Sequence, residues 1–316
     1  KLTGIRVDYD VYDSSQVLET KLLNGHSGYD VVVPSDRFVG KEAAAGVFRP
    51  LDRKRLPNFR NLDQPILKAA AAFDPGNAHA VPYFWDAVGI GYNAKKIRER
   101  MADAPVDSLD MIFKPEYAKR FADCGIAVLD EPDGVLQVAL NYLGRSPYSA
   151  KEEDYRAAEE LLMKVRPYIK YFHSSRYIDD LADGDLCLAL GWNGDFRTAR
   201  DRAREAANEI DYRIPREGTE ITIDSLAIPA DAPHPDNAAL FIDYLMEPRV
   251  AADGADVVGY ATANEAARGL IKPELRDDPD LYPPPKVMSR LFPDKTATPA
   301  VEQLRSRAWS RIKTGS

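Results

Sequence analysis

Stretches with the hydrophobic pattern of β-strands alternate along this chain with stretches that have the pattern of helices. Apolar residues run almost continuously through 29–33 and 186–190, which is typical of buried strands. Residues 154–166 repeat apolar side chains at helical spacing and end at Pro167, and residues 237–246 predict another helix. This alternation predicts an α/β fold with a largely parallel sheet.

The two ends of the chain follow the same alternation. Residues 5–12 are predicted as a strand, and residues 14–24 as a helix that ends before Gly25. Near the other end, Thr298 and Pro299 predict the start of a last helix, with the threonine as its N-cap. The chain opens with Lys-Leu-Thr-Gly and shows no signal peptide, so we expect its natural N-terminus to lie further upstream.

The length, charge and residue composition of the chain argue against several classes of function. A length of 316 residues suits two domains, and a formal net charge of −8 argues against nucleic acid or an anionic membrane as a partner. The four histidines are scattered singly and the two cysteines form no Cys-x-x-Cys pair, so we expect no metal site and no cofactor. Adjacent carboxylates such as Asp130 and Glu131 are typical of solvated or helix-capping residues, so catalysis is not expected.

Polar side chains follow or interrupt three predicted strands. Ser35 follows the first apolar run, Trp192 and Asp195 follow the second, and Asp224 interrupts the strand-like residues 222–231. Ligands of open α/β sheets bind outside the carboxyl ends of strands, so these residues predict one shared site. A carboxylate pairs with an ammonium ion while an aromatic face covers the alkyl part. Either stretch taken alone is equally compatible with a solvated loop.

Seven ordered blocks of the chain resemble the periplasmic polyamine (putrescine/spermidine)-binding proteins of bacterial ABC transporters. They are residues 29–35 (YDVVVPS), 45–52 (AGVFRPLD), 89–93 (GIGYN), 172–175 (FHSS), 191–195 (GWNGD), 228–231 (IPAD) and 307–309 (RAW). The resemblance implies a type II periplasmic-binding-protein fold, in which two α/β lobes are joined by crossing hinge strands. Residues 1–92 and 224–277 would form the first lobe, and residues 93–223 and 278–316 the second.

The resemblance also implies a function. Such a protein binds a small amine between its lobes in the periplasm, closes without covalent chemistry or a cofactor, and is recognised as a monomer by an inner-membrane ABC permease. The ligand contacts that it places on this chain are Ser35, Trp192, Asp195, Asp224 and Tyr260. The two aspartates would bind ammonium, and the tryptophan and tyrosine would cover the alkyl chain.

The cysteines of this chain fall where the putrescine-binding members of the family have their cysteine pair. Spacing alone leaves one disulfide and two free thiols equally open. The resemblance favours a disulfide between Cys124 and Cys187.

The chain departs from the family at the far end of the ligand. Gly134 stands where the putrescine-binding members have a glutamate, and Arg37, Glu131 and Asp294 are expected near that end. Thr222 replaces an aromatic residue. The first strand of the family, with its Asn-Trp-Ser-Asp-Tyr motif, has no counterpart in the printed sequence.

The departures leave two interpretations of Arg37 open, and the fold leaves a third interpretation of the function. Arg37 can pair with Glu131 or Asp294, which keeps the ligand a cationic di- or polyamine. Arg37 can instead bind a ligand carboxylate, which predicts an ω-amino acid such as 4-aminobutyrate or 5-aminovalerate. The third interpretation is a periplasmic sensor input built on the same fold.

Overall fold

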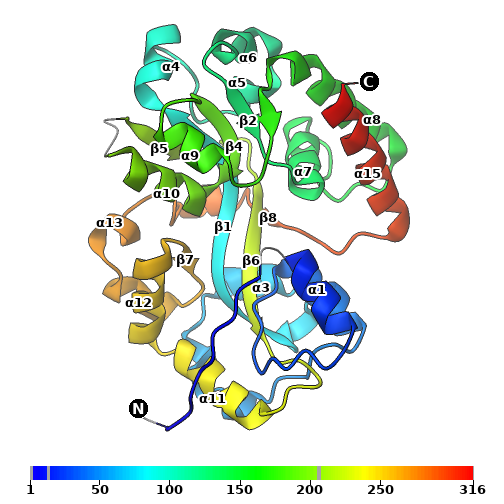
Figure 1. Ribbon diagram of the computed structural model, residues 1–316, viewed down its shortest axis with the longest axis vertical. Helices are drawn as coiled ribbons and strands as arrows, with labels where there is room; N and C mark the ends of the chain where they lie inside the picture. Colours follow the sequence, from blue (N-terminus) through cyan, green and yellow to red (C-terminus); the bar gives the residue numbers. More distant parts are fainter. Residues whose placement is uncertain (1–2, 13–14, 205–207, 316) are drawn as a thin grey trace. The chain divides into compact units, whose positions relative to one another are not determined.

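The structure of the protein is a computed structural model that describes residues 3–12, 15–204 and 208–315. The chain divides into two compact units. Unit 1 comprises residues 1–85 and 222–276, and unit 2 comprises residues 86–221 and 277–316. The long strands β1 (Ala80–Asn93) and β6 (Glu220–Ala227) each begin in one unit and end in the other (Figure 1).

Unit 1 is built mainly of helices and turns beside its segments of β1 and β6. Strand β7 (Ala261–Thr262) pairs antiparallel with β1, with Phe84 opposite Thr262. The core includes Leu56, Val81, Leu226, Ile228, Ile242 and Met246. The helices of this unit are α1 (Ser15–Leu23), α2 (Asp36–Ala44), α3 (Gln64–Ala70), α11 (Pro235–Leu245), α12 (Pro248–Val258) and α13 (Pro273–Arg276), with 3-10 turns η1 (Arg53–Arg55), η2 (Pro57–Asn61), η3 (Pro75–Asn77) and η5 (Glu265–Leu270).

Unit 2 contains most of the paired strands. Strand β2 (Ile126–Val128) lies between β3 (Tyr171–Phe172) and β4 (Leu188–Trp192) and is parallel to both. Strand β1 runs antiparallel to β4 and to β5 (Ile210–Arg213), and β6 pairs in parallel with β8 (Phe292–Pro293). The sheet is therefore mixed rather than largely parallel, because β1 runs against the strands that it pairs with.

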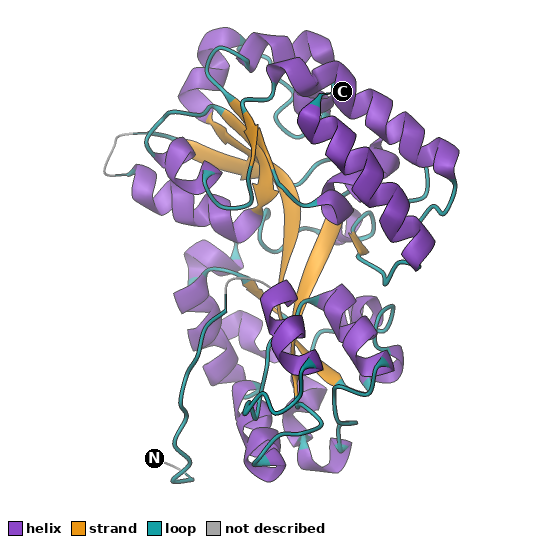
Figure 2. Cartoon of the chain, turned by 45° about the vertical axis from the view of Figure 1, so that its right-hand side comes forward, coloured by secondary structure: helices purple, strands orange, loops and turns teal. Residues whose placement is uncertain are grey.

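Helices cover both faces of the unit 2 sheet. Helices α9 and α10 lie on one side, and α7, α8 and α15 lie on the other (Figure 1), and Figure 2 shows helices on both sides of the strands. The helices of this unit are α4 (Ala94–Arg100), α5 (Asp110–Phe113), α6 (Pro115–Phe121), α7 (Pro132–Tyr142), α8 (Glu152–Val165), α9 (Tyr177–Ala182), α10 (Asn193–Ala203), α14 (Pro285–Met288) and α15 (Pro299–Thr314), with the 3-10 turn η4 (Arg166–Tyr168). The predicted α/β fold, with sheets flanked by helices, is confirmed.

Most of the predicted elements are present. Helices α1, α8, α11 and α15 and strand β4 occur within a few residues of the predicted bounds. The predicted cap of α15 is correct, since the Thr298 hydroxyl accepts a hydrogen bond from the backbone N–H of Val301 at 3.4 Å.

Two predicted strands are wrong or incomplete. Residues 5–12 are extended but form no backbone ladder with the described part of the chain, and Val7, Tyr9 and Val11 are exposed. The apolar run 29–33 forms only one bridge, in which Val32 lies opposite Ala227. An alternating pattern makes a stretch suitable for a strand, but a strand also needs a partner for its backbone groups.

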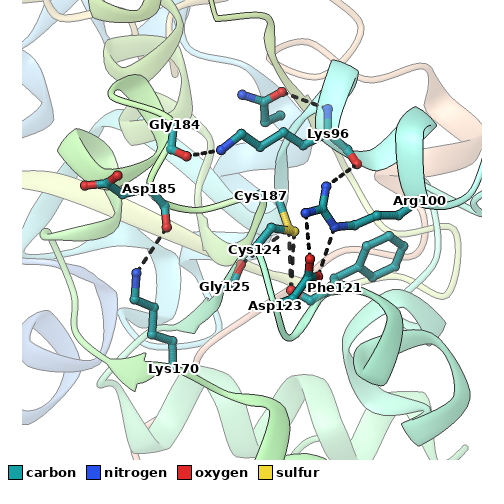
Figure 3. The surroundings of a disulfide bond; sticks show 11 residues. Lys96, Arg100, Phe121, Asp123, Cys124, Gly125, Lys170, Gly184, Asp185 and Cys187 are labelled. Atoms are coloured by element: carbon teal, nitrogen blue, oxygen red, sulfur yellow. Dashed lines mark hydrogen bonds and ion pairs between the residues drawn. A yellow bond between two sulfur atoms is a disulfide. The ribbon is translucent and has the colours of Figure 1, made fainter.

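The predicted disulfide is confirmed. Cys124 and Cys187 are bonded across 63 positions of sequence, and both are buried (Figure 3). Beside them, Arg100 forms a two-point ion pair with Asp123, with its Nε and Nη2 at 3.0 and 2.8 Å from the carboxylate oxygens. The bond ties the end of α6 to the start of β4, and β4 is the strand that leads to Trp192.

Candidate ligand-binding site

In unit 1, β6 brings two of the predicted site residues together. Ser35, the N-cap residue of α2, lies opposite Asp224 in an isolated antiparallel bridge. The N–H of Ser225 donates to the carbonyl of Pro34 at 3.0 Å, which extends the pairing made by Val32. Backbone hydrogen bonds between distant segments therefore fix the positions of Ser35 and Asp224.

The Asp224 carboxylate has an unusual environment. Burial raises the pKa of Asp224 to about 6. Within residues 3–12, 15–204 and 208–315, no side chain or N–H forms a hydrogen bond or ion pair with this carboxylate. The side chain is partly buried, and a partly desolvated carboxylate without a cation is unfavourable, so this position favours a bound cation.

Tyr12 lies close to the same carboxylate. Burial raises the pKa of Tyr12 to about 12, and the negative charges of Asp224 and Glu42 add to this rise. The Tyr12 hydroxyl donates to the carbonyl of Val33 at 2.7 Å. It is therefore held beside Asp224 without neutralising that charge.

Arg37 and Tyr260 also belong to unit 1. Arg37 is the second residue of α2, and its guanidinium carbon lies 4.8 Å from the centroid of the Phe38 ring. Tyr260 follows Gly259, which ends α12 in the left-handed conformation at φ 78°. Both side chains are partly buried.

In unit 2, Trp192 and Asp195 lie where β4 passes into α10. Trp192 is the N-cap residue of α10, and Asp195 is in its first turn. The buried Tyr177 hydroxyl donates to Asp195 and accepts from the N–H of Trp192 at 3.2 Å. A Cβ at Gly191 would lie 2.6 Å from the Tyr177 ring, so this close approach requires glycine. Tyr177 was not identified from the sequence.

Glu131 and Asp294 lie in unit 2 as well. Asp294 is buried beside β8 and accepts hydrogen bonds from Gln137 Nε2 and from the N–H of Lys295, the latter at 2.7 Å. Glu131 is the N-cap residue of α7 and points its Cγ towards Gly134. A further carboxylate lies against Gly134, and it belongs to Glu220, which the sequence reading did not select.

The described residues were also compared with the requirements of a metal site and of a membrane-spanning helix. Among the described residues, no group of three or more His, Cys, Asp or Glu side chains is arranged to hold a metal ion. None of the helices described is long and apolar enough to cross a membrane.

The chain is similar over its length to known bacterial binding proteins. Residues 1–283 match the family described as bacterial extracellular solute-binding protein. The chain is 48% identical to the putrescine-binding periplasmic protein PotF of Escherichia coli and 47% identical to the putrescine-binding periplasmic protein SpuD of Pseudomonas aeruginosa. Both alignments cover 100% of this chain, and they cover 86% and 87% of the respective relatives.

A solved structure with the same fold is the spermidine/putrescine ABC transporter substrate-binding protein PotD of Streptococcus pneumoniae. Its TM-score is 0.88 at 26% identity, over 99% of this chain and 92% of the solved chain. These relatives are binding components of transporters rather than enzymes, and the predicted periplasmic location is confirmed by them. The chain thus belongs to the bacterial extracellular solute-binding proteins, as the substrate-binding component of an ABC importer with a small-molecule ligand and a membrane permease as its partners.

Proposed function

We propose that this protein binds a small aliphatic di- or polyamine of the putrescine class and presents it to an ABC permease in the inner membrane. The observation that carries this proposal is the Asp224 carboxylate, which is partly buried, has a pKa raised by burial, and has no cation among the described side chains. An organic ammonium ion supplies both a positive charge and three hydrogen-bond donors.

The other candidate residues have separate roles in this proposal. Asp195 binds ammonium in a position fixed by the Tyr177 hydroxyl. Trp192 and Tyr260 cover the methylene chain, and Ser35 offers a hydroxyl beside Asp224. Arg37, Glu131 and Asp294 set the length of ligand that is accepted.

The protein acts in this proposal as a monomer without a catalytic step. The two lobes close by hinge motion when the ligand binds, and the permease recognises the closed form. The names of the relatives favour amines over ω-amino acids, since PotF and SpuD are described as putrescine-binding.

Calorimetric titration tests the choice of ligand. The protein is titrated with putrescine, cadaverine, spermidine, 4-aminobutyrate and 5-aminovalerate. We expect saturable binding of at least one di- or polyamine and no binding of the two amino acids. Binding of an amino acid alone would contradict the proposal and would make Arg37 the residue that receives the carboxylate.

A further inference from the structure

One buried carboxyl group in unit 1 takes no part in the proposed ligand contacts. Glu42 lies near the C-terminal end of α2, and only 1% of the residue is exposed. Neither of its carboxyl oxygens has a hydrogen-bond partner within residues 3–12, 15–204 and 208–315. A carboxylate buried in this way is unfavourable, and the negative end of the helix dipole adds to the cost. The protonated, neutral form of Glu42 is therefore the form that fits this position.

The titratable groups around Glu42 come from three segments of unit 1. Glu19 of α1 places a second carboxylate close to it, and Lys41 of α2 holds its ammonium 2.6 Å from that second carboxylate. Tyr12, from the segment before α1, is also within electrostatic range. Burial raises the pKa of Glu42 to about 8, the charge of Glu19 adds to this rise, and Lys41 opposes it. Glu42 thus keeps its proton to a higher pH than an ordinary glutamate.

Helix α1 connects this carboxyl group to the candidate site. The helix packs against α2, and its Leu18 is fully buried. At the start of α1, the Ser15 hydroxyl lies 3.1 Å from the Ser35 hydroxyl, and it accepts a hydrogen bond from the Ser35 N–H at 3.4 Å. One end of α1 therefore contacts a candidate ligand residue, while Glu19 in its middle lies close to Glu42.

We propose that Glu42 makes the contact between α1 and α2 sensitive to pH. The protonated side chain is tolerated between the two helices. After the proton is lost, repulsion from Glu19 and the cost of the buried charge favour an open form, in which α1 moves away and Glu42 reaches water. Opening also separates Ser15 from Ser35. The switch lies within unit 1 and needs no ligand, so it goes beyond the proposed function.

Hydrogen exchange of the α1 amides, followed by mass spectrometry, tests the proposal on the ligand-free protein. Exchange is measured at pH 6, 7, 8 and 9 and corrected for the intrinsic chemical rate at each pH. The closed form holds a proton that the open form releases, so protection of α1 should fall as the pH rises towards 8 and level off above it. We expect a fall of at least about tenfold between pH 6 and pH 8.

Glu42→Gln keeps the shape of the side chain but cannot ionise, so its α1 protection should not depend on pH. Glu274→Gln, at an exposed glutamate of the same unit, is the matched control and should keep the wild-type response. Helix α8 in unit 2 is the internal reference. A wild-type fall that is absent, that persists in Glu42→Gln, or that is equally large in α8 would overturn the proposal.

A second variant keeps the test decisive if Glu42→Gln does not fold. Glu19→Gln removes the neighbouring negative charge and leaves Lys41 without that partner, so Glu42 should ionise at a lower pH. Protection of α1 should then fall less between pH 6 and pH 8 than it does in the wild type. A fall as large as that of the wild type would overturn the proposed repulsion between the two glutamates.

Discussion

Asp224 in unit 1 and Asp195 in unit 2 are the same type of residue beside a strand, but they are held in different ways. Asp195 accepts a hydrogen bond from Tyr177, whose ring is fully buried. Asp224 receives no such bond from the described residues, and burial raises its pKa to about 6. A side-chain hydrogen bond orients the first carboxylate, whereas the described residues provide no such bond to the second.

The structural elements that hold Asp195 and Asp224 also differ. Strand β4, which leads to Trp192 and Asp195, starts beside the disulfide and ends at the Tyr177 hydroxyl. Asp224 is supported by the bridge to Ser35 and the backbone bonds that flank it. Unit 2 therefore holds the Asp195 carboxylate by a side-chain hydrogen bond, whereas unit 1 fixes Asp224 through its backbone.

The largest expected effect comes from removing the disulfide. A double Cys124→Ser and Cys187→Ser variant should lose about 4 kcal/mol of unfolding free energy, since the bond closes a loop of 63 positions. Thermal melting of the wild type with and without a reducing agent should reproduce this loss, and the variant should not respond to the reagent. A wild-type transition that is insensitive to reduction would show that β4 does not depend on the bond.

Asp224→Asn should have the next largest effect, on binding rather than on folding. We expect diamine binding to weaken by at least about 2 kcal/mol, because the substitution removes one partner of a buried charge pair. The ligand-free protein should melt at the same temperature or higher, because a desolvated charge has been removed. Calorimetry and thermal melting measure the two effects, with Asp236→Asn at an exposed ion pair of the same unit as the control. Unchanged affinity would show that Asp224 is not a ligand contact.

The pKa of Asp224 predicts a pH dependence of binding. The raised pKa means that the ligand-free folded protein takes up a proton at Asp224 as the pH falls through about 6. A cationic ligand requires the ionised carboxylate, so affinity should be constant above this pH and fall up to about tenfold per pH unit below it. Titrations at pH 5, 6, 7 and 8 test this, and Asp224→Asn should abolish the change. A profile that persists in the variant would assign the proton to another group.

The sequence identified two candidate residues that the fold brings together, but it did not predict all of the backbone around them. Ser35 and Asp224 were selected because they follow or interrupt strand-like runs, and β6 does bring them together. The strand predicted at residues 5–12 is absent, because alternation of Val7, Tyr9 and Val11 carries no information about a partner.

Tyr177, whose hydroxyl contacts Asp195 and Trp192, was not identified from the sequence. Tyr177 is 15 residues before Trp192 and looks like any core aromatic residue. Only the fold shows that its hydroxyl contacts Asp195 and the N–H of Trp192, and no local pattern could have identified it.

The smallest expected effect tests the orientation of Asp195. Tyr177→Phe removes the hydroxyl that donates to Asp195 and accepts from the N–H of Trp192. Asp195 keeps its charge but becomes free to rotate, so diamine binding should weaken by only about 1 kcal/mol. Tyr142→Phe, which removes a similar hydroxyl from Asp110 at 2.7 Å elsewhere in unit 2, is the matched control for loss of stability. If Tyr177→Phe weakened diamine binding as much as Asp224→Asn, the distinction between the two aspartates would be wrong. The hydroxyl that orients Asp195 would then matter for binding as much as the charge of Asp224.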